Sequence, residues 1–600
     1  MLIRVQGPDG QKRIEVESGE TTETLMAKIR IAYGYLDCEV FTARDHKTRV
    51  PVGGRSLAQC GLKNGDLLFV RPVCDEPMTQ DVEQSNEKER IVNTVAAKPD
   101  VRRKVIVAED EVDKILSAQD GRISRSRHAL CNHNVSTKCV LCTPLEPYDE
   151  AYLKEKNIKH LSFHSYIKKL TSGVDQGKFA PLENISLKIK PNCSRHPPYP
   201  KGICSKCQPS AVTLDQQKYR HVDAVLFENS QIVNRFLDFW RQSLLQRVGI
   251  LLGRYETYNE VPLGICARVA AIYEPPQNSA RDGFELLDDP NEETVDELCA
   301  KLGLRRVGWI FCDLLPLDVQ KGTVHYLRDV DFSYLLSAQE CITAAALQNK
   351  YPNPCKLSSD GYSGSKFVTV CVTGDKNNQI HMEAYQVSNQ CMALVKDDCL
   401  IPTQDAPELA WVKESTPKKF VPDVFYKTKD RYGLEVQKVA RPLPVEFLLI
   451  DLPVFSPNDS VNTFRSEGPH FTVENRAFAN QVQDLPAVNQ YLRNFTASKD
   501  LLAACRDFHF LLYLATLDVV HLEMDKLLEA VKTKNAEACN TWAAESEQWR
   551  TFETILSSMG SNDVEMPQKE ASRSTWNCEH CTFTNESDTN TCEMCSLPRT

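Results

Sequence analysis

The sequence predicts a multidomain α+β protein, and three observations support this fold class. The chain has 600 residues, a length that corresponds to about three to five folded units. Hydrophobic residues make up 42% and charged residues 25%, which are ordinary values for globular proteins, so most of the chain should fold. Three groups of cysteine and histidine have spacings that suit metal binding, which predicts small units held together by an ion.

Changes in composition divide the chain into seven segments. Two polar stretches without apolar periodicity are interpreted as linkers. The predicted segments are a small α+β module at 1–72, a linker at 73–104, two metal clusters at 105–215, an α/β unit at 216–345, a unit ending in helices at 346–557, a linker at 558–574 and a last cysteine cluster at 575–600.

Charge and hydropathy argue against two classes of partner. The net charge is -10, whereas a nucleic-acid-binding protein usually carries a basic surface, so we expect no nucleic acid. No apolar stretch approaches the ~18 residues of a membrane-spanning helix, and the longest run, 508–517, is interpreted as a buried helix. The first residues lack a signal-peptide core, so we expect a protein of the cytosol or nucleus without membrane insertion.

The first segment has the element order of a ubiquitin-like (UBX-like) β-grasp. The alternation of apolar and polar residues predicts strands, and the spacing of Leu25, Ile29 and Tyr33 predicts a helix. The predicted elements are strands at 2–5, 13–17 and 67–70 and a helix capped by Thr21 or Thr22. The alternative is another small α+β fold.

Two clusters of the third segment predict structural zinc sites. Each begins with a closely spaced cysteine and histidine and ends in a CxxC pair, whose two thiolates can reach one ion from a single turn. The predicted ligands are Cys131, His133, Cys139 and Cys142 in the first cluster and Cys193, His196, Cys204 and Cys207 in the second. His128 is the alternative to His133. The chain has 23 cysteines, an odd number without a secretory signal, which favours reduced thiols over a disulfide framework.

These sites are predicted to be structural because four ligands are available each time, whereas catalytic zinc keeps one position open. About 50 residues separate the clusters, including a predicted helix near 166–170, which favours two independent fingers over a cross-braced RING. His160 and His164 are also spaced i, i+4. They lack the glutamate of an HExxH motif, so we expect no metal there.

The last cluster predicts a third, four-thiolate zinc ribbon. Its ligands are two CxxC pairs around a short loop: Cys578, Cys581, Cys592 and Cys595. The unit resembles the NZF (RanBP2-type) zinc fingers. The resemblance implies ubiquitin contacts by Thr582, Phe583 and Met594. RNA-binding fingers of that class use arginines, and none lies between Trp576 and Leu597.

The fourth segment resembles the MPN (JAMM) fold of ubiquitin-removing metalloproteases. The resemblance rests on predicted strands at 223–227, 248–253 and 306–311 and a helix at 232–244. Active members of that family use a Glu, an HxH pair and an Asp to hold zinc and activate its water.

This sequence departs from the metalloprotease pattern at the positions that carry the chemistry. Gln246 replaces the Glu, Phe311-Cys312-Asp313 replaces HxH, and Ser337 is kept while Glu340 replaces the Asp. Asp313 and Glu340 could bind a hard cation weakly, but the resemblance implies an inactive domain and no enzyme. No phosphate-binding GxxxxGK[ST] motif is present either.

Taken together, the segments resemble the nuclear protein localisation protein 4 family over nearly the whole chain. Phrases specific to it are Arg220–Asp223, Ala271–Pro276, Tyr385–Met392 and Cys595–Thr600. The resemblance implies a non-enzymatic adaptor that binds ubiquitin and polyubiquitin chains. Its implied partners are ubiquitin fusion degradation protein 1 and the valosin-containing protein AAA ATPase. The implied process is proteasomal degradation in the cytoplasm and nucleus, and at the endoplasmic reticulum through partners.

Two alternatives come from other function classes. One is a zinc-dependent deubiquitinase or a ubiquitin ligase component, which ubiquitin-cleavage and ubiquitin-transfer assays would distinguish. The other is an RNA-binding zinc-finger protein, which the acidic charge balance disfavours.

Overall fold

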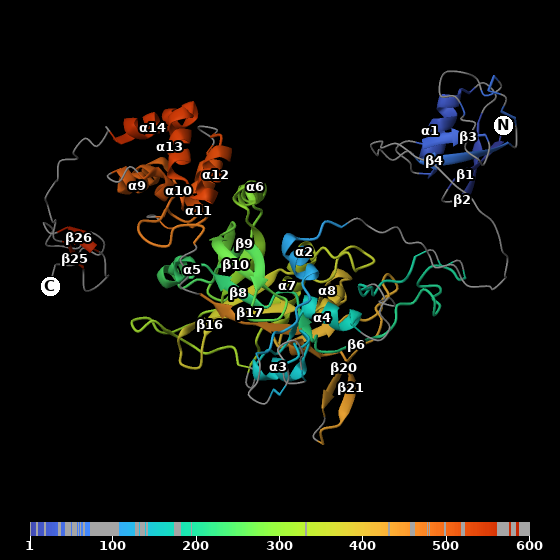
Figure 1. Ribbon diagram of the computed structural model, residues 1–600, viewed down its shortest axis with the longest axis horizontal. Helices are drawn as coiled ribbons and strands as arrows, with labels where there is room; N and C mark the ends of the chain where they lie inside the picture. The colour runs from blue at the N-terminus through green and yellow to red at the C-terminus, as the bar shows by residue number, and fades with distance from the viewer. Residues whose placement is uncertain are drawn as a thin grey trace. The chain divides into compact units, whose positions relative to one another are not determined.

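The protein is described by a computed structural model, and Figure 1 shows its course. It covers parts of residues 2–72, most of residues 107–560 and two short strands at Thr575–Asn577 and Thr584–Glu586. The described parts of the first segment are 2–7, 10–16, 20–33, 38–42, 50, 57, 59–60, 62–63 and 66–72. Within 107–560 the description omits 127–130, 133–138, 140–141, 173–181, 192, 194, 330–332, 430–431, 457–461, 477, 479–480, 497–499 and 518–521.

The chain forms two compact units, Met1–Asp100 and Val101–Thr600. The first holds a four-stranded sheet of order β2-β1-β4-β3, in which β1 pairs antiparallel with β2 and parallel with β4. Its elements are β1 (Leu2–Gly7), β2 (Gly10–Glu15), α1 (Thr22–Tyr33), β3 (Cys38–Phe41) and β4 (Leu67–Pro72). Apolar residues of α1, including Leu25 and Ile29, are buried against the sheet. The predicted strands and helix are confirmed, while β3 was not predicted.

The second unit is built on an eight-stranded mixed sheet of order β23-β17-β16-β13-β9-β10-β8-β24. In chain order its strands are β8 (Ala224–Phe227), β9 (Val248–Tyr258), β10 (Gly264–Tyr273), β13 (Arg305–Cys312), β16 (Val368–Gly374), β17 (Ile380–Val387), β23 (Leu449–Leu452) and β24 (Val454–Phe455). Strands β10 and β16 are buried along nearly their whole length, as expected where a sheet is covered on both sides. At Gly253 a Cβ would lie 1.9 Å from the Arg268 carbonyl oxygen, so only glycine fits the close approach of β9 to β10.

The sheet crosses the boundary that the sequence predicts at residues 345 and 346. Strands β16, β17, β23 and β24 come from the segment assigned to the next unit, yet β16 pairs with β13 and β24 pairs with β8. Residues 225, 310, 370 and 452 therefore share one buried core. A boundary at this point does not separate two cores, because strand pairing is nonlocal and the composition does not change where the chain leaves the sheet.

Shorter elements surround this sheet. They are α2 (Glu111–Ala118), α3 (Glu150–Glu155), β5 (Leu161–Ser162), α4 (Phe163–Thr171), β6 (Val212–Leu214), β7 (Tyr219–Arg220), α5 (Ser230–Ser243), β11 (Gln277–Ser279), β12 (Phe284–Leu286), α6 (Glu292–Leu302), β14 (Pro316–Asp318), β15 (Thr323–Val324), α7 (Ala338–Lys350), α8 (Asn389–Lys396), β18 (Leu400–Pro402), β19 (Leu409–Val412), β20 (Val424–Lys429), β21 (Glu435–Val439), β22 (Leu443–Pro444) and the 3-10 turn Val445–Leu448. Several helices begin at a side-chain cap: Asn229 caps α5 and Ser388 caps α8.

Six helices end the described part of 107–560, shown in orange and red in Figure 1. They are α9 (Leu485–Thr496), α10 (Leu501–Cys505), α11 (Phe508–Ala515), α12 (Asp525–Thr533), α13 (Ala536–Glu545) and α14 (Glu547–Gly560). The predicted helical region and the buried helix at 508–517 are confirmed. Helix α14 runs a few residues into the predicted linker 558–574. Among the residues that the structure describes, every helix is too short or too polar to span a bilayer.

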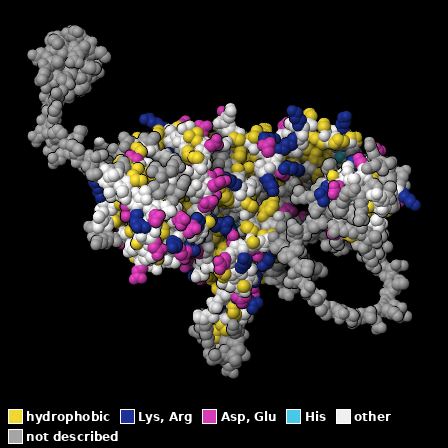
Figure 2. Space-filling view, turned by 90° about the horizontal axis from the view of Figure 1, so that it is seen from above, with side chains coloured by type: hydrophobic (Ala, Val, Ile, Leu, Met, Phe, Trp, Pro, Cys, Tyr) yellow, Lys and Arg dark blue, Asp and Glu magenta, His cyan; other side chains and the backbone are white. Residues whose placement is uncertain are grey.

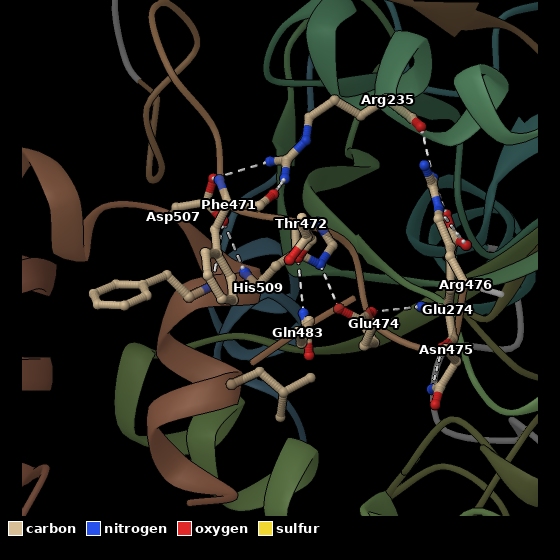
Figure 3. A network of polar contacts seen from close by, with 12 residues as sticks. Arg235, Glu274, Phe471, Thr472, Glu474, Asn475, Arg476, Gln483, Asp507 and His509 are labelled. Atoms are coloured by element: carbon tan, nitrogen blue, oxygen red, sulfur yellow. Dashed lines mark hydrogen bonds and ion pairs between the residues drawn. The ribbon is translucent and has the colours of Figure 1, made fainter. Parts of the chain in front are cut away.

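A buried polar network joins the sheet to these helices (Figure 3). The Arg476 guanidinium donates to Glu274, just beyond β10, at 2.6 Å, and the backbone N–H of Glu274 donates to Glu474 at 2.9 Å. His509, in α11, lies 2.6 Å from the other Glu474 oxygen. Residues 471–476 therefore connect the sheet to the helices through paired charges, which satisfies the polar groups that burial would otherwise leave unpaired.

Candidate metal centres

The second cysteine-histidine cluster brings all four predicted ligands together. The Sγ atoms of Cys193 and Cys204 lie 3.6 Å apart, and those of Cys204 and Cys207 lie 3.7 Å apart. His196 Nε2 lies 3.0 Å from Cys207 Sγ. A zinc ion with Zn–S bonds of about 2.3 Å has tetrahedral edges of about 3.8 Å, so the thiol spacing fits such an ion.

Local backbone structure sets the orientation of these ligands. The Cys204 N–H points at Cys207 Sγ at 3.4 Å, and the Cys207 N–H donates to the Cys204 carbonyl oxygen at 3.1 Å, as the tight turn of a CxxC pair requires. His196 Nδ1 lies 2.7 Å from the Pro197 carbonyl oxygen. That contact assigns the proton to Nδ1 and leaves Nε2 as the ligand atom.

The electrostatics of the cluster favour thiolate. Hydrogen bonds from the backbone N–H groups of Lys206 and Cys207 lower the pKa of the Cys204 thiol to about 6. Thiolate is the form that binds metal, so the lowered pKa favours metal binding by Cys204. The cluster is thus a closed site of three thiols and one imidazole, which suits structural zinc.

The first cluster is described for three of its four predicted ligands. The Sγ atoms of Cys131 and Cys139 lie 3.6 Å apart and those of Cys139 and Cys142 lie 3.8 Å apart. His133 and its alternative His128 lie outside the described residues, so the fourth ligand stays a prediction. The third cluster, Cys578, Cys581, Cys592 and Cys595, also lies outside them, as do Thr582, Phe583 and Met594. None of the described cysteines forms a disulfide.

The second finger is anchored to the larger unit. The Tyr199 hydroxyl donates to the Thr416 carbonyl oxygen at 2.5 Å, and its ring meets Phe420 edge-on at 5.9 Å. Strand β6, which follows the finger, pairs in parallel with β20. The finger is therefore fixed by a contact from the loop between its ligands and by the strand that follows them.

The histidines at 160 and 164 each contact a carboxylate within hydrogen-bond distance. His160 Nε2 lies 3.1 Å from Asp451 Oδ1, and His164 Nε2 lies 2.9 Å from the buried Asp113 Oδ1. The two histidines contact different carboxylates. In the described parts of the chain, neither belongs to a group of side chains that could bind one metal ion.

Gln246 and Phe311, at two of the metalloprotease positions, have structural roles. The Gln246 amide donates to the carbonyl oxygens of Arg281 and Leu314, both at 2.9 Å, and its oxygen accepts the Leu314 N–H at 3.1 Å. Phe311 is buried, with its ring 4.8 Å from that of Trp309. Neither residue is available to a metal or to a water molecule that would attack a substrate.

Arg328 is the residue of this centre that the sequence analysis missed. Its side chain is 1% exposed and its guanidinium binds both Asp313 and Glu340, each at 2.7 Å. Glu340 also completes a capping box with Ser337 at the start of α7. Asp313 and Glu340, which could bind a hard cation weakly, therefore share one arginine, which balances one of their two negative charges. No local motif signals Arg328, which lies 15 residues after Asp313 in irregular chain.

Models of protein families match three stretches of the chain. Residues 247–557 match the model of the NPL4 family, 107–244 match the model of that family's zinc binding region, and 1–71 match the model named nuclear pore localisation protein NPL4.

Curated relatives are similar over their whole length. Nuclear protein localization protein 4 homologs of Mus musculus and Homo sapiens are each 49% identical over 100% of this chain and 99% of their own length. The Drosophila melanogaster homolog is 47% identical over 100% of this chain and 95% of its own. These names describe localization proteins and not enzymes. The resemblance inferred from the sequence is confirmed: the chain belongs to the NPL4 family.

Proposed function

We propose that the protein is a non-catalytic adaptor. As a heterodimer with ubiquitin fusion degradation protein 1, it binds polyubiquitinated proteins and delivers them to the valosin-containing protein AAA ATPase. The ATPase unfolds or extracts them for proteasomal degradation, including proteins leaving the endoplasmic reticulum. Membership of the NPL4 family over the full chain supports this role.

The proposal that the protein is not an enzyme rests on the residues at the positions where metalloproteases of the MPN fold bind zinc. Hydrolysis of an isopeptide bond there requires a metal that lowers the pKa of its water and a carboxylate that takes the proton. Gln246 has no proton-accepting carboxylate, and Phe311 offers no lone pair. Asp313 and Glu340 are both bound by the Arg328 guanidinium. A domain of this kind can bind ubiquitin conjugates, but it lacks the groups that would cleave them.

We further propose the identity of the individual modules. The order β2-β1-β4-β3, with a parallel central pair and one helix, supports a ubiquitin-like fold for residues 1–72. Strands β8, β9 and β13 with helix α5 support an MPN-like unit that starts near residue 216 and extends past 345. The CxxC pairs at 578–595 support an NZF finger that binds ubiquitin through Thr582, Phe583 and Met594.

The proposal also covers the bound metal, the surface charge and the cellular location. We assign one structural Zn²⁺ to each of the three cysteine clusters, and none of them has a catalytic role. Acidic and basic side chains are interspersed over the face in Figure 2, without the broad basic field that nucleic acid would require. We place the protein in the cytoplasm and nucleus, and at the endoplasmic reticulum through its partners.

Reconstitution tests the adaptor role. The full chain is combined with ubiquitin fusion degradation protein 1, the ATPase, ATP and a fluorescent polyubiquitinated substrate. We expect ATP-dependent loss of substrate fluorescence that requires this chain and ubiquitin on the substrate. Unfolding at the same rate without the chain would contradict the proposal.

A cleavage assay tests the alternative function. The pure chain is incubated with ubiquitin chains of several linkages, with and without added Zn²⁺, and we expect no free ubiquitin. Metal-dependent cleavage that is lost in Asp313→Asn or Glu340→Gln would establish a deubiquitinase instead.

A further inference from the structure

Arg328 forms hydrogen bonds and ion pairs with three residues. Nε donates to Asp313 Oδ2 at 2.9 Å, and Nη1 donates to the Leu335 carbonyl oxygen and to Glu340 Oε2, both at 2.8 Å. Nη2 contacts Asp313 Oδ2 and Glu340 Oε1, both at 2.7 Å. Four of the five N–H donors of the guanidinium therefore make hydrogen bonds, and Nη2 also forms an ion pair with Asp313.

The surroundings favour a permanent cation at this point. The guanidinium carbon lies 5.5 Å from the centre of the Phe311 ring and 5.3 Å from that of Tyr334, in reach of a cation–π attraction. The two carboxylates are 30% and 22% exposed, whereas Arg328 is almost fully enclosed behind them. Solvent ions can therefore reach the carboxylates, but they meet a positive charge that is already bound.

We propose that Arg328 is the resident cation of the central unit: its guanidinium occupies the space between Asp313 and Glu340 that a divalent metal ion would need, and so excludes metal from this centre. The zinc that the MPN fold implies does not fit the residues present. Two carboxylate ligands remain without imidazole, and both are bound by a cationic group that cannot be deprotonated in a protein. Arg328 also holds the Leu335 loop and the start of α7 against β13.

This inference rests on the proposed non-catalytic nature of the unit, but not on the proposed ubiquitin or ATPase partners. It predicts that this centre can bind a metal ion only after the guanidinium is removed. If the guanidinium is removed, two adjacent carboxylates remain, and oxygen ligands of that kind suit a hard divalent cation such as Mn²⁺.

Mn²⁺ binding to the zinc-loaded full chain tests the inference. Free Mn²⁺ is counted by electron paramagnetic resonance during titration. We expect no Mn²⁺ bound at this centre in the wild-type chain and about one additional ion per chain in Arg328→Ala. Arg328→Lys should bind none, because the positive charge is kept. The triple variant Asp313→Asn, Arg328→Ala, Glu340→Gln should bind none, because the ligands are gone.

Arg305→Ala is the matched control. Arg305 pairs with Asp110 at 2.8 Å but is half exposed, and Asp110 keeps a second partner in Lys366. Its loss changes net charge by the same amount and should add no Mn²⁺ site.

Three outcomes would overturn the inference. One is a folded Arg328→Ala chain that binds no more Mn²⁺ than wild type. Another is Mn²⁺ binding by wild type that Asp313→Asn abolishes. If Arg328→Ala is unfolded, Mn²⁺ should restore its circular dichroism during refolding, and failure to do so is the third. Ubiquitin binding of the same variants is measured separately, so a failure of the adaptor proposal would not be mistaken for a failure here.

Discussion

The second zinc finger and the centre around Arg328 both bring together side chains that can carry negative charge, but they differ in the source of the cation that pairs with them. In the finger, the donor atoms of Cys193, His196 and the CxxC pair lie within 4.8 Å of one another. Such a group needs an external cation. In the centre, Asp313 and Glu340 converge on a guanidinium supplied by the chain itself.

The comparison shows why a cluster of ligand-type residues does not by itself indicate a metal. No protein side chain is a cation that binds soft thiolates as well as Zn²⁺ does. Carboxylates can be neutralised by arginine with good bidentate geometry, and a buried arginine does not exchange with solvent ions. We therefore expect metal dependence in the finger and metal independence in the centre.

The largest expected effect is in the finger. In Cys204→Ser, the loss of one thiolate should release the zinc and with it folding free energy of the order of 10 kcal/mol, since a structural zinc site and its fold form one equilibrium. Hydrogen exchange across residues 187–214 should rise, and elemental analysis should show one zinc fewer per chain. Cys60→Ser, at a half-buried cysteine outside the clusters, is the control and should keep the zinc content.

Arg328→Ala should be the next largest change. Removal of one member of a buried ion pair leaves uncompensated charge and typically costs about 3–5 kcal/mol. Urea unfolding without added metal measures this loss. Arg305→Ala, whose side chain is 49% exposed, should cost about 1 kcal/mol or less. Equal losses in the two variants would contradict a special role for Arg328.

The third prediction concerns binding without cleavage. Replacing Thr582 and Phe583 with alanine should weaken ubiquitin binding by the isolated terminal finger by about 2 kcal/mol or more, as for a contact hot spot, while its zinc stays bound. Titration calorimetry measures the affinity, and Thr589→Ala serves as the control. The full chain should lose affinity only in part if the central unit supplies a second site. Unchanged binding in the isolated finger would rule out this contact surface.

A smaller effect should come from substitution of Asp451, the carboxylate that His160 contacts. The hydrogen bond from His160, with help from Lys159, holds the pKa of Asp451 well below its usual range. The lowered pKa stabilises the fold above the unfolded value of about 3.9, and this stability is lost as pH falls below it. Asp451 is 44% exposed, so Asp451→Asn should cost less than about 1 kcal/mol at pH 7. Its unfolding free energy should also depend less on pH between about 5 and 3.

Patterns confined to short stretches were predictable from the sequence. The CxxC pairs lie within four residues and determine their own geometry, so both described clusters form where they were expected. Strands β8, β9 and β13 and helix α5 follow from runs of apolar residues. Family membership followed from motifs such as Tyr385–Met392.

The remainder depends on contacts between distant residues. The pairing of β24 with β8 joins residues more than 200 positions apart, and no composition change marks it, so the boundary at 345 was placed inside one sheet. Arg328 was missed for the same reason: its partners lie on β13's end and on α7, and a loop arginine looks like any exposed charge.

The ratio of zinc to protein in the purified full chain tests the contrast between the two regions most directly. Elemental analysis, with the protein concentration from amino-acid analysis, should give three zinc ions per chain, one for each cysteine cluster and none at Arg328. The ratio should stay at three after incubation with excess zinc and gel filtration. A fourth ion that disappears in Asp313→Asn would contradict the resident cation, and a ratio of one or none would contradict the structural fingers.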